Sequence, residues 1–383
     1  MSSGDPETRA SANPDAHTPS TRSPRSMILD HTDHRADPGA WARELGISDE
    51  AVALYLDSEV IDLHVDSFIW TRIFGYDLCE RHDHGLFGAR FYSQVDFPRI
   101  LEAQLGGAIW VITTNPAKVA SEREAAFFEN LAELKALFAK VPEHFSIVRS
   151  AADYRRARAL GKHGAFLGIQ GGNALDHGPD SIERIPEGDI LRVTLVHLST
   201  SSLGTTSSPL ARGDDGLTPK GKDFVRRLQA KKIFVDLAHV SKRGFWDAVE
   251  VADPSQPLIV THTGVEGVHP HWRNLDDDQL RAIAERGGTV GVMYQSSFLG
   301  DPYLGGKAAR IVDHLEHIVK TVGEDHASLG SDWDGAILPP RDMPTCLELP
   351  KLVQIMLDRK WSEARIRKVL GENFLRVVAE LRG

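Results

Sequence analysis

The chain has 383 residues, 41% hydrophobic and 26% charged, which is enough to bury one large core or two smaller ones. Its formal net charge of -10 argues against nucleic acid or an anionic membrane as the main partner, because either would repel the protein. A small-molecule partner is therefore expected. The only two cysteines, Cys79 and Cys346, lie far apart in sequence, which predicts no disulfide framework and a cytoplasmic location.

The first 40 residues are rich in Ser, Pro, Thr, Asp and Arg, and they contain no apolar segment of the kind that a secretory signal needs. We expect residues 1–40 to form a disordered tail and residues 41–383 to form one domain. No stretch approaches the roughly 20 apolar residues of a membrane helix. The sequence thus predicts a soluble protein.

After a first helix expected around Trp41 to Ser58, short apolar runs typical of strands recur along the chain, and helical patterns separate most of them. The strand runs are Val60–Asp66, Gly107–Thr113, Ala165–Gln170, Leu191–Leu198, Ile233–His239, Leu258–His262, Thr289–Tyr294 and Ala327–Asp332. The clearest helical segments are Glu122–Lys140, Ala151–Leu160, Thr218–Ala230, Asp276–Glu285 and Ala308–Val322.

Metal-capable side chains stand at the ends of four of these runs. His64 and Asp66 end the first run, His239 the fifth, His262 the sixth and Asp332 the eighth. A doubly wound sheet is the competing architecture, but only a closed ring brings these four strand ends to one mouth. The sequence therefore predicts an α/β fold of the (β/α)8 barrel type with its site at the C-terminal ends of the strands.

Three imidazoles and two carboxylates are ligands that suit zinc or a similar divalent ion. Such a set is large enough to hold one or two ions. A pair of ions about 4 Å apart can lower the pKa of a shared water and polarise a carbonyl, which is a common arrangement for hydrolysing amides.

The ordered motifs resemble the membrane (renal) dipeptidase family of metallopeptidases, which are binuclear zinc barrels of the amidohydrolase group. The likeness runs from about Val60 to about Val377. It is carried by Asp62-Leu63-His64-Val65-Asp66, Gly168-Ile169-Gln170-Gly171-Gly172, Thr194-Leu195-Val196-His197, Gly216-Leu217-Thr218-Pro219-Lys220-Gly221, Asp236-Leu237-Ala238-His239-Val240-Ser241, Arg273-Asn274 and Gly330-Ser331-Asp332-Trp333-Asp334-Gly335.

The resemblance implies a role for each matching position. His64 and Asp66 would bind one zinc, and His239 and His262 the other. Asp332 would transfer the proton, His197 would contact the substrate near the scissile carbonyl, and Arg273 would bind the free carboxylate. A planar guanidinium suits that last task because it can donate two hydrogen bonds to one carboxylate. A homodimer is also expected from the resemblance.

One position departs from the family pattern. Where the family has a glutamate that bridges both metals, this chain has Gln170. A neutral amide offers one weak contact where a carboxylate offers two strong ones, so we expect weaker binding of at least one ion and a mononuclear, loosely binuclear or empty site. The family's following histidine is also missing, and Asp176 or His177 would have to reach back to compensate.

The leading functional prediction is a metal-dependent, dipeptidase-like amidohydrolase that cleaves a dipeptide or an N-acyl amino acid. Gln170 motivates an alternative, a tailoring enzyme of a specialised biosynthetic pathway with altered or lost peptidase chemistry. A non-catalytic carboxylate-binding protein is the third reading, although a pure binder needs no such set of metal-capable residues. The long segment from Ser67 to Gln94 follows the first strand and is expected to form a pocket wall.

Overall fold

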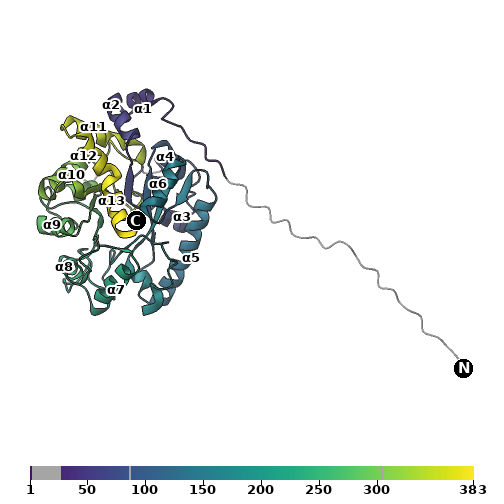
Figure 1. The fold of residues 1–383 in the computed structure, drawn as a ribbon, viewed down its shortest axis with the longest axis vertical. Helices are drawn as coiled ribbons and strands as arrows, with labels where there is room; N and C mark the ends of the chain where they lie inside the picture. The colour runs from purple at the N-terminus through teal and green to yellow at the C-terminus, as the bar shows by residue number, and fades with distance from the viewer. Residues whose placement is uncertain (2–26, 86–87, 303–304) are drawn as a thin grey trace.

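The computed structural model describes residue 1 and residues 27–85, 88–302 and 305–383, and these fold into a (β/α)8 barrel with helices around a ring of parallel strands (Figure 1). Eight strands follow the order β6-β5-β4-β2-β1-β9-β8-β7. A parallel bridge between Asp236 and Ile259 joins the two ends of this order. The predicted barrel is thus confirmed, and a doubly wound sheet is excluded.

Each of the eight predicted strand runs overlaps one strand of the barrel. These strands are β1 Ile61–Val65, β2 Gly107–Thr113, β4 His163–Gln170, β5 Arg192–Thr194, β6 Phe234–Asp236, β7 Val260–Thr263, β8 Val290–Val292 and β9 Ala327–Leu329. A short further strand that the sequence did not suggest, β3 (Phe145–Ile147), pairs with β4 outside the ring.

The helices surround the barrel, and the five helical segments expected from the sequence are all present. The helices are α1 Pro38–Leu45, α2 Asp49–Leu56, α3 Phe68–Phe74, α4 Phe97–Glu102, α5 Ala120–Ala139, α6 Ala151–Ala159, α7 Pro219–Ala230, α8 Lys242–Val251, α9 Asp277–Glu285, α10 Ala309–Val322, α11 Pro350–Asp358, α12 Glu363–Arg367 and α13 Asn373–Arg382.

The single helix expected around Trp41 to Ser58 is wrong, because two helices occupy this segment. Gly46 ends α1 in a left-handed conformation with φ of 68°. Ser48 then caps α2, its side chain accepting a hydrogen bond from the backbone N–H of Ala51.

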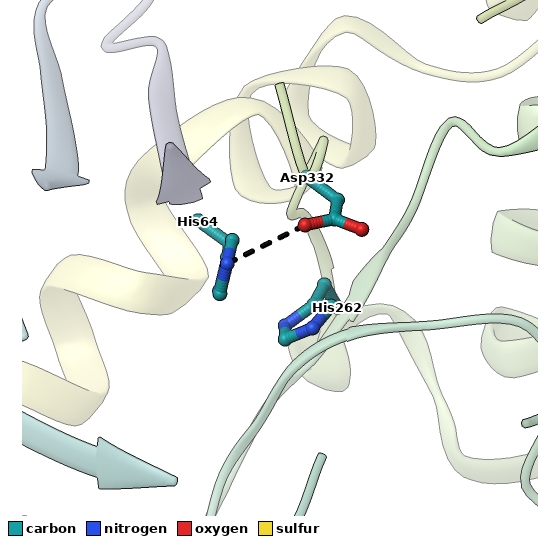
Figure 2. A group of neighbouring side chains, drawn as sticks. All are labelled: His64, His262 and Asp332. Atoms are coloured by element: carbon teal, nitrogen blue, oxygen red, sulfur yellow. Dashed lines mark ion pairs between the residues drawn. The ribbon is translucent and has the colours of Figure 1, made fainter. Parts of the chain in front are cut away.

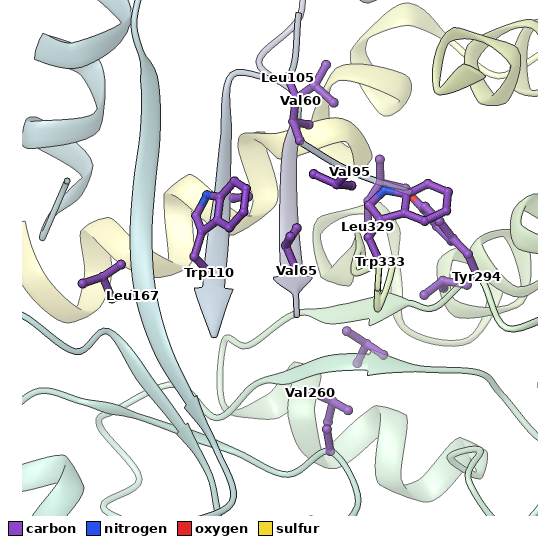
Figure 3. Close-up of a cluster of buried hydrophobic side chains, with 14 of the residues drawn as sticks. Val60, Val65, Val95, Leu105, Trp110, Leu167, Val260, Tyr294, Leu329 and Trp333 are labelled. Atoms are coloured by element: carbon purple, nitrogen blue, oxygen red, sulfur yellow. The ribbon is translucent and has the colours of Figure 1, made fainter. Parts of the chain in front are cut away.

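Two apolar cores hold the barrel. The larger lies between the strands and the surrounding helices and includes Trp110 and Leu167, which are paired across β2 and β4 (Figure 3). The smaller fills the barrel interior with Ile109, Phe166 and Phe234, and α13 packs against it. In Figure 1 the C-terminal end of α13 accordingly lies over the centre of the ring. This end of the barrel is plugged, which leaves the opposite end for a site.

Irregularities in two strands aim histidines into the barrel. The register of β1 shifts between Asp62 and Val65, and that of β7 shifts between Val260 and Thr263. A β-bulge turns the following side chain to the other face of a strand and is frequent beside active sites. His64 and His262 lie within these shifted segments, and their ring centroids are only 3.8 Å apart.

Of the tail expected over residues 1–40, residues 2–26 lie outside the described part of the chain. Residues 27–37 contact the barrel domain, since Met27 N donates to Lys140 O at 2.8 Å and Leu29 is buried. Among the described residues, no helix is both long and apolar enough to cross a membrane. Cys79 and Cys346 are free thiols, and both are buried.

Candidate metal centre and substrate cavity

The predicted site residues converge at the C-terminal ends of the strands. His64, His262 and Asp332 offer ligand atoms that all lie within 4.8 Å of one another, and Figure 2 shows the three side chains facing a common point. His64 Nε2 lies 3.5 Å from Asp332 Oδ1, and the Nε2 atoms of His239 and His262 lie 2.8 Å apart. The strand ends that carry these residues therefore lie close together, as the sequence predicted.

His239 and Asp332 both have a left-handed backbone, with φ of 64° at each. Such a conformation is uncommon for residues other than glycine and concentrates at functional sites, where the surrounding structure enforces it. Each of the two is the third residue after the end of a strand, β6 for His239 and β9 for Asp332.

Gln170 lies between the two groups of predicted ligands. Its Oε1 atom is 3.1 Å from His64 Nε2, and its Nε2 atom is 3.3 Å from His239 Nε2. Thr113 donates to Asp66 Oδ1 at 3.1 Å on the same side of the site. Gln170 thus occupies a bridging position, but it reaches its neighbours as a neutral amide.

Burial sets the charge of the site. It raises the pKa of Asp66 to about 7 and that of Asp332 well above its usual range. It lowers the pKa values of His239 and His262 well below the ordinary value, so that both rings are neutral near pH 7. Neutral imidazoles beside carboxyls that gain from a nearby cation form a donor set that fits a divalent metal ion.

A charged network that the sequence reading missed lies directly below these residues. Arg192 on β5 and Asp236 on β6 are fully buried and form an ion pair of 3.1 Å. Asp236 Oδ2 also accepts hydrogen bonds from Thr194 and Thr261, both at 2.7 Å. The available signal was a lone arginine in an otherwise apolar strand run, where an unpaired charge would be costly.

Arg273 lies in the loop between β7 and α9, with 4% of its surface exposed. Its Nη2 atom donates to the backbone oxygen of His262 at 2.7 Å, while its buried Nε has no partner among the described residues. Burial lowers its pKa to about 10, so the guanidinium remains charged at neutral pH. A fixed cation with a donor to spare is suited to binding an anion.

His197 lies beside His239, with the two ring centroids 4.7 Å apart and nearly perpendicular. Desolvation is the main cause that lowers its pKa to about 3, with Arg273 and Arg192 adding to the effect. The ring is thus neutral and offers a hydrogen bond to a bound molecule.

A cavity of about 440 Å³ opens onto part of this site and is lined by Asp66, Gln170, His197, His239, Arg273 and Asp332. Its walls are largely apolar and include Trp70, Leu198, Trp272 and Phe298. A second cavity, of about 520 Å³, adjoins it and is lined by Trp70, Phe74, Tyr76, Phe91 and Tyr92. The segment from Ser67 to Gln94 therefore does form a pocket wall, as expected.

The two residues considered as substitutes for the missing bridging ligands serve other contacts. Asp176 pairs with Arg123 at 2.6 Å and accepts from Ser202 at 2.6 Å. His177 is exposed and lies in a different pocket, beside Lys220. Neither contacts Gln170 in the part of the chain that the structure describes.

Residues 48–382 match the family model described as membrane dipeptidase (peptidase family M19). The fold is similar to that of the dipeptidase AC, a metallo peptidase, with a TM-score of 0.76, 24% identity and coverage of 85% of this chain and 98% of that one.

Two further solved structures share the fold. One is the probable dipeptidase PvdM from Pseudomonas aeruginosa, with a TM-score of 0.77, 18% identity and coverage of 89% of this chain and 99% of that one. The other is a metallo peptidase from Rhodobacter sphaeroides liganded with a phosphinate mimic of the dipeptide L-Ala-D-Ala, with a TM-score of 0.75, 23% identity and coverage of 85% and 99%.

Proposed function

Since this chain belongs to the membrane dipeptidase family of metallopeptidases, we propose that it is a metal-dependent amidohydrolase acting on a dipeptide or an N-acyl amino acid. The observation that carries the proposal is that His239, Asp332 and Arg273 line one cavity, with Nε2 of His262 only 2.8 Å from Nε2 of His239. In the proposed mechanism Arg273 binds the substrate's free carboxylate and so fixes the position of the amide bond.

A bound divalent ion, zinc in the family, would supply the means to activate water and to polarise the amide carbonyl. Asp332, which lines the cavity with its Oδ1 atom 3.5 Å from His64 Nε2, takes a proton from the attacking water and passes it to the leaving amine. His197, neutral and facing the cavity, donates a hydrogen bond to the carbonyl oxygen as negative charge develops on it.

A panel of dipeptides and N-acyl amino acids, assayed with zinc and with a chelator, tests this proposal. We expect hydrolysis that the chelator abolishes, and we expect Asp332→Asn to remove turnover while the protein keeps its metal. An Asp332→Asn variant with near-wild-type turnover would show that the assigned proton transfer is wrong. Binding of the panel without turnover would instead favour the non-catalytic carboxylate-binding protein.

The aromatic cavity and Gln170 together favour a second candidate, a tailoring enzyme that acts on a bulkier peptide-like intermediate of a biosynthetic pathway. A dipeptide of small residues leaves the aromatic cavity unused. Preference for substrates with a large aromatic or acyl group over such dipeptides would support this candidate.

The cellular location and the oligomeric state are also proposals. The free, buried thiols Cys79 and Cys346 support a cytoplasmic location. A homodimer, expected from the family resemblance, is testable by light scattering on the purified protein.

A further inference from the structure

Arg192 brings a permanent positive charge to the base of the metal centre. It is fully buried on β5, where its Nη1 atom lies 3.1 Å from Asp236 Oδ2 and donates to the backbone oxygen of Ile169 at 3.0 Å. Its Nη2 atom points to the other side and lies 2.6 Å from Nδ1 of His64. The guanidinium is therefore held between Asp236 and a residue expected to bind metal.

This contact determines which nitrogen of His64 carries the hydrogen. A guanidinium has only donors, so Nδ1 of His64 must accept, and the neutral ring keeps its hydrogen on Nε2. The surroundings of Nε2 agree, since it lies 3.1 Å from Gln170 Oε1 and 3.5 Å from Asp332 Oδ1, which are both acceptors. His64 thus presents a donor to the site instead of the lone pair that a metal requires.

His262 has the opposite arrangement. The hydroxyl of Thr261 donates to Asp236 Oδ2 at 2.7 Å, so its oxygen is free to accept from His262 Nδ1, 2.9 Å away. The lone pair of His262 is then on Nε2, which faces the site. Metal-binding histidines are commonly fixed in this way, by a hydrogen bond from the ring nitrogen that does not bind the metal.

His239 also turns a lone pair on Nε2 toward the site, but its buried Nδ1 atom has no hydrogen-bond partner among the described residues. Because Gln170 presents its oxygen to His64, its amide nitrogen faces His239 Nε2 at 3.3 Å and makes that atom an acceptor. Two ring nitrogens with lone pairs therefore face each other at 2.8 Å. Such a pair repels unless a cation is shared between them.

We propose that this centre binds a single divalent ion on His239 and His262, and that the guanidinium of Arg192 takes the place of a second ion beside His64 and Asp66. The proposal rests on the proposed function only in taking the bound cation to be a metal. Distance alone would also admit His64 as a ligand. The contact with Arg192 decides against it.

The first test measures zinc content and zinc titration of the chelator-stripped full chain, with Co²⁺ absorption as a second readout. We expect one tightly bound ion per chain. His64→Ala should retain that ion, whereas the matched variant His239→Ala should weaken its binding by at least 100-fold. Two ions of similar affinity in the wild type, or loss of the ion from His64→Ala, would overturn the proposal.

The second test restores the conditions for binding a second metal ion. Gln170→Glu alone should still bind one ion, because Arg192 continues to hold Nδ1 of His64. Gln170→Glu combined with Arg192→Met should bind two, and a double variant that folds yet binds only one would contradict the role given to Arg192. Where removal of Arg192 prevents folding, the comparison of His64→Ala with His239→Ala still decides.

These outcomes separate the metal assignment from the proposed activity. One ion on His239 and His262 with no hydrolysis of any substrate would leave the metal assignment standing and reject the hydrolase. Hydrolysis by an enzyme that holds two ions would support the hydrolase and reject the metal assignment.

Discussion

Arg273 is tied to the backbone of His262, because its Nη2 atom donates to the His262 carbonyl oxygen at 2.7 Å. The proposed carboxylate-binding group and a proposed metal-binding group are therefore fixed to each other by one hydrogen bond. This relation sets the separation between the substrate's carboxylate and the reacting amide, so it bears on which substrates are positioned for reaction.

Replacing Arg273 should affect binding of the free carboxylate most. We expect Arg273→Met to raise KM for a dipeptide on the order of 100-fold, since a buried charge partner is lost. Arg273→Lys, which keeps the charge but not the planar fork, should raise KM by about 10-fold. Steady-state kinetics on a dipeptide and on its C-terminal amide would check this, because Arg273→Met should abolish the preference for the free acid.

Trp70 connects the catalytic cavity to the aromatic cavity. It stacks on Phe74, with the ring centroids 5.4 Å apart, and its indole nitrogen donates to the backbone oxygen of Asp334 at 2.5 Å. We expect Trp70→Ala to reduce kcat/KM about 10-fold more for substrates with a large aromatic group than for those with alanine.

The matched control for that variant is Trp246→Ala, because Trp246 lies on α8 away from both cavities with 38% of its surface exposed. Its selectivity should equal that of the wild type. Equal losses on small and large substrates in Trp70→Ala would mean that the aromatic wall does not select substrate size.

The sequence predicted the barrel and the ligand-bearing strand ends because both follow from local patterns. Apolar runs ending in His64, His239 and His262 indicate strands that deliver side chains to one mouth. Gln170 was identified differently, through the family resemblance, because it stands where the family has a bridging glutamate. In each case the information lay within a few neighbouring residues.

The parts that escaped prediction depend on contacts between distant segments. The register shift in β1, within which His64 lies, exists only against the neighbouring strand β2. The role of Arg192 appears only once β1, β5 and β6 are adjacent, since it joins His64 to Asp236. The sequence shows an arginine within a strand run, but it does not show which acceptors the arginine will contact.

Gly330 provides a test of the packing beneath the site. A Cβ atom added there would lie 1.7 Å from the backbone oxygen of Thr261, which has no flexible end that can move aside. We expect Gly330→Ala to lower the free energy of unfolding by about 3 kcal/mol or more, as for overpacking in a tight interior. Urea unfolding followed by circular dichroism measures this change.

Gly178→Ala is the control for that substitution, since no atom of the described residues lies within 4 Å of its added Cβ and its φ of -153° is negative. Its free energy of unfolding should change by no more than about 0.5 kcal/mol. If the two variants proved equally stable, strands β7 and β9 would have to be less closely packed than described.

His163 should contribute to acid sensitivity away from the metal centre. Its ring is buried, its Nδ1 donates to Leu105 O at 2.8 Å, and its Nε2 accepts from Trp110 Nε1 at 3.2 Å. Burial is the main cause that lowers its pKa from 6.5 to about 3. A protonated ring would lose the bond from Trp110, and the folded protein therefore resists protonation.

Between pH 6.5 and 3 the unfolded chain then binds more protons than the folded one, so stability falls as the pH is lowered through this window. Above pH 6.5 His163 is neutral in both the folded and the unfolded chain, so it costs the folded protein no stability there. The loss from His163 amounts to at most about 5 kcal/mol. His163→Gln keeps a donor and an acceptor but cannot titrate, so its free energy of unfolding should fall less steeply between pH 6.5 and 4 than that of the wild type. Parallel slopes for the two proteins in urea unfolding would show that His163 is not a source of the acid sensitivity.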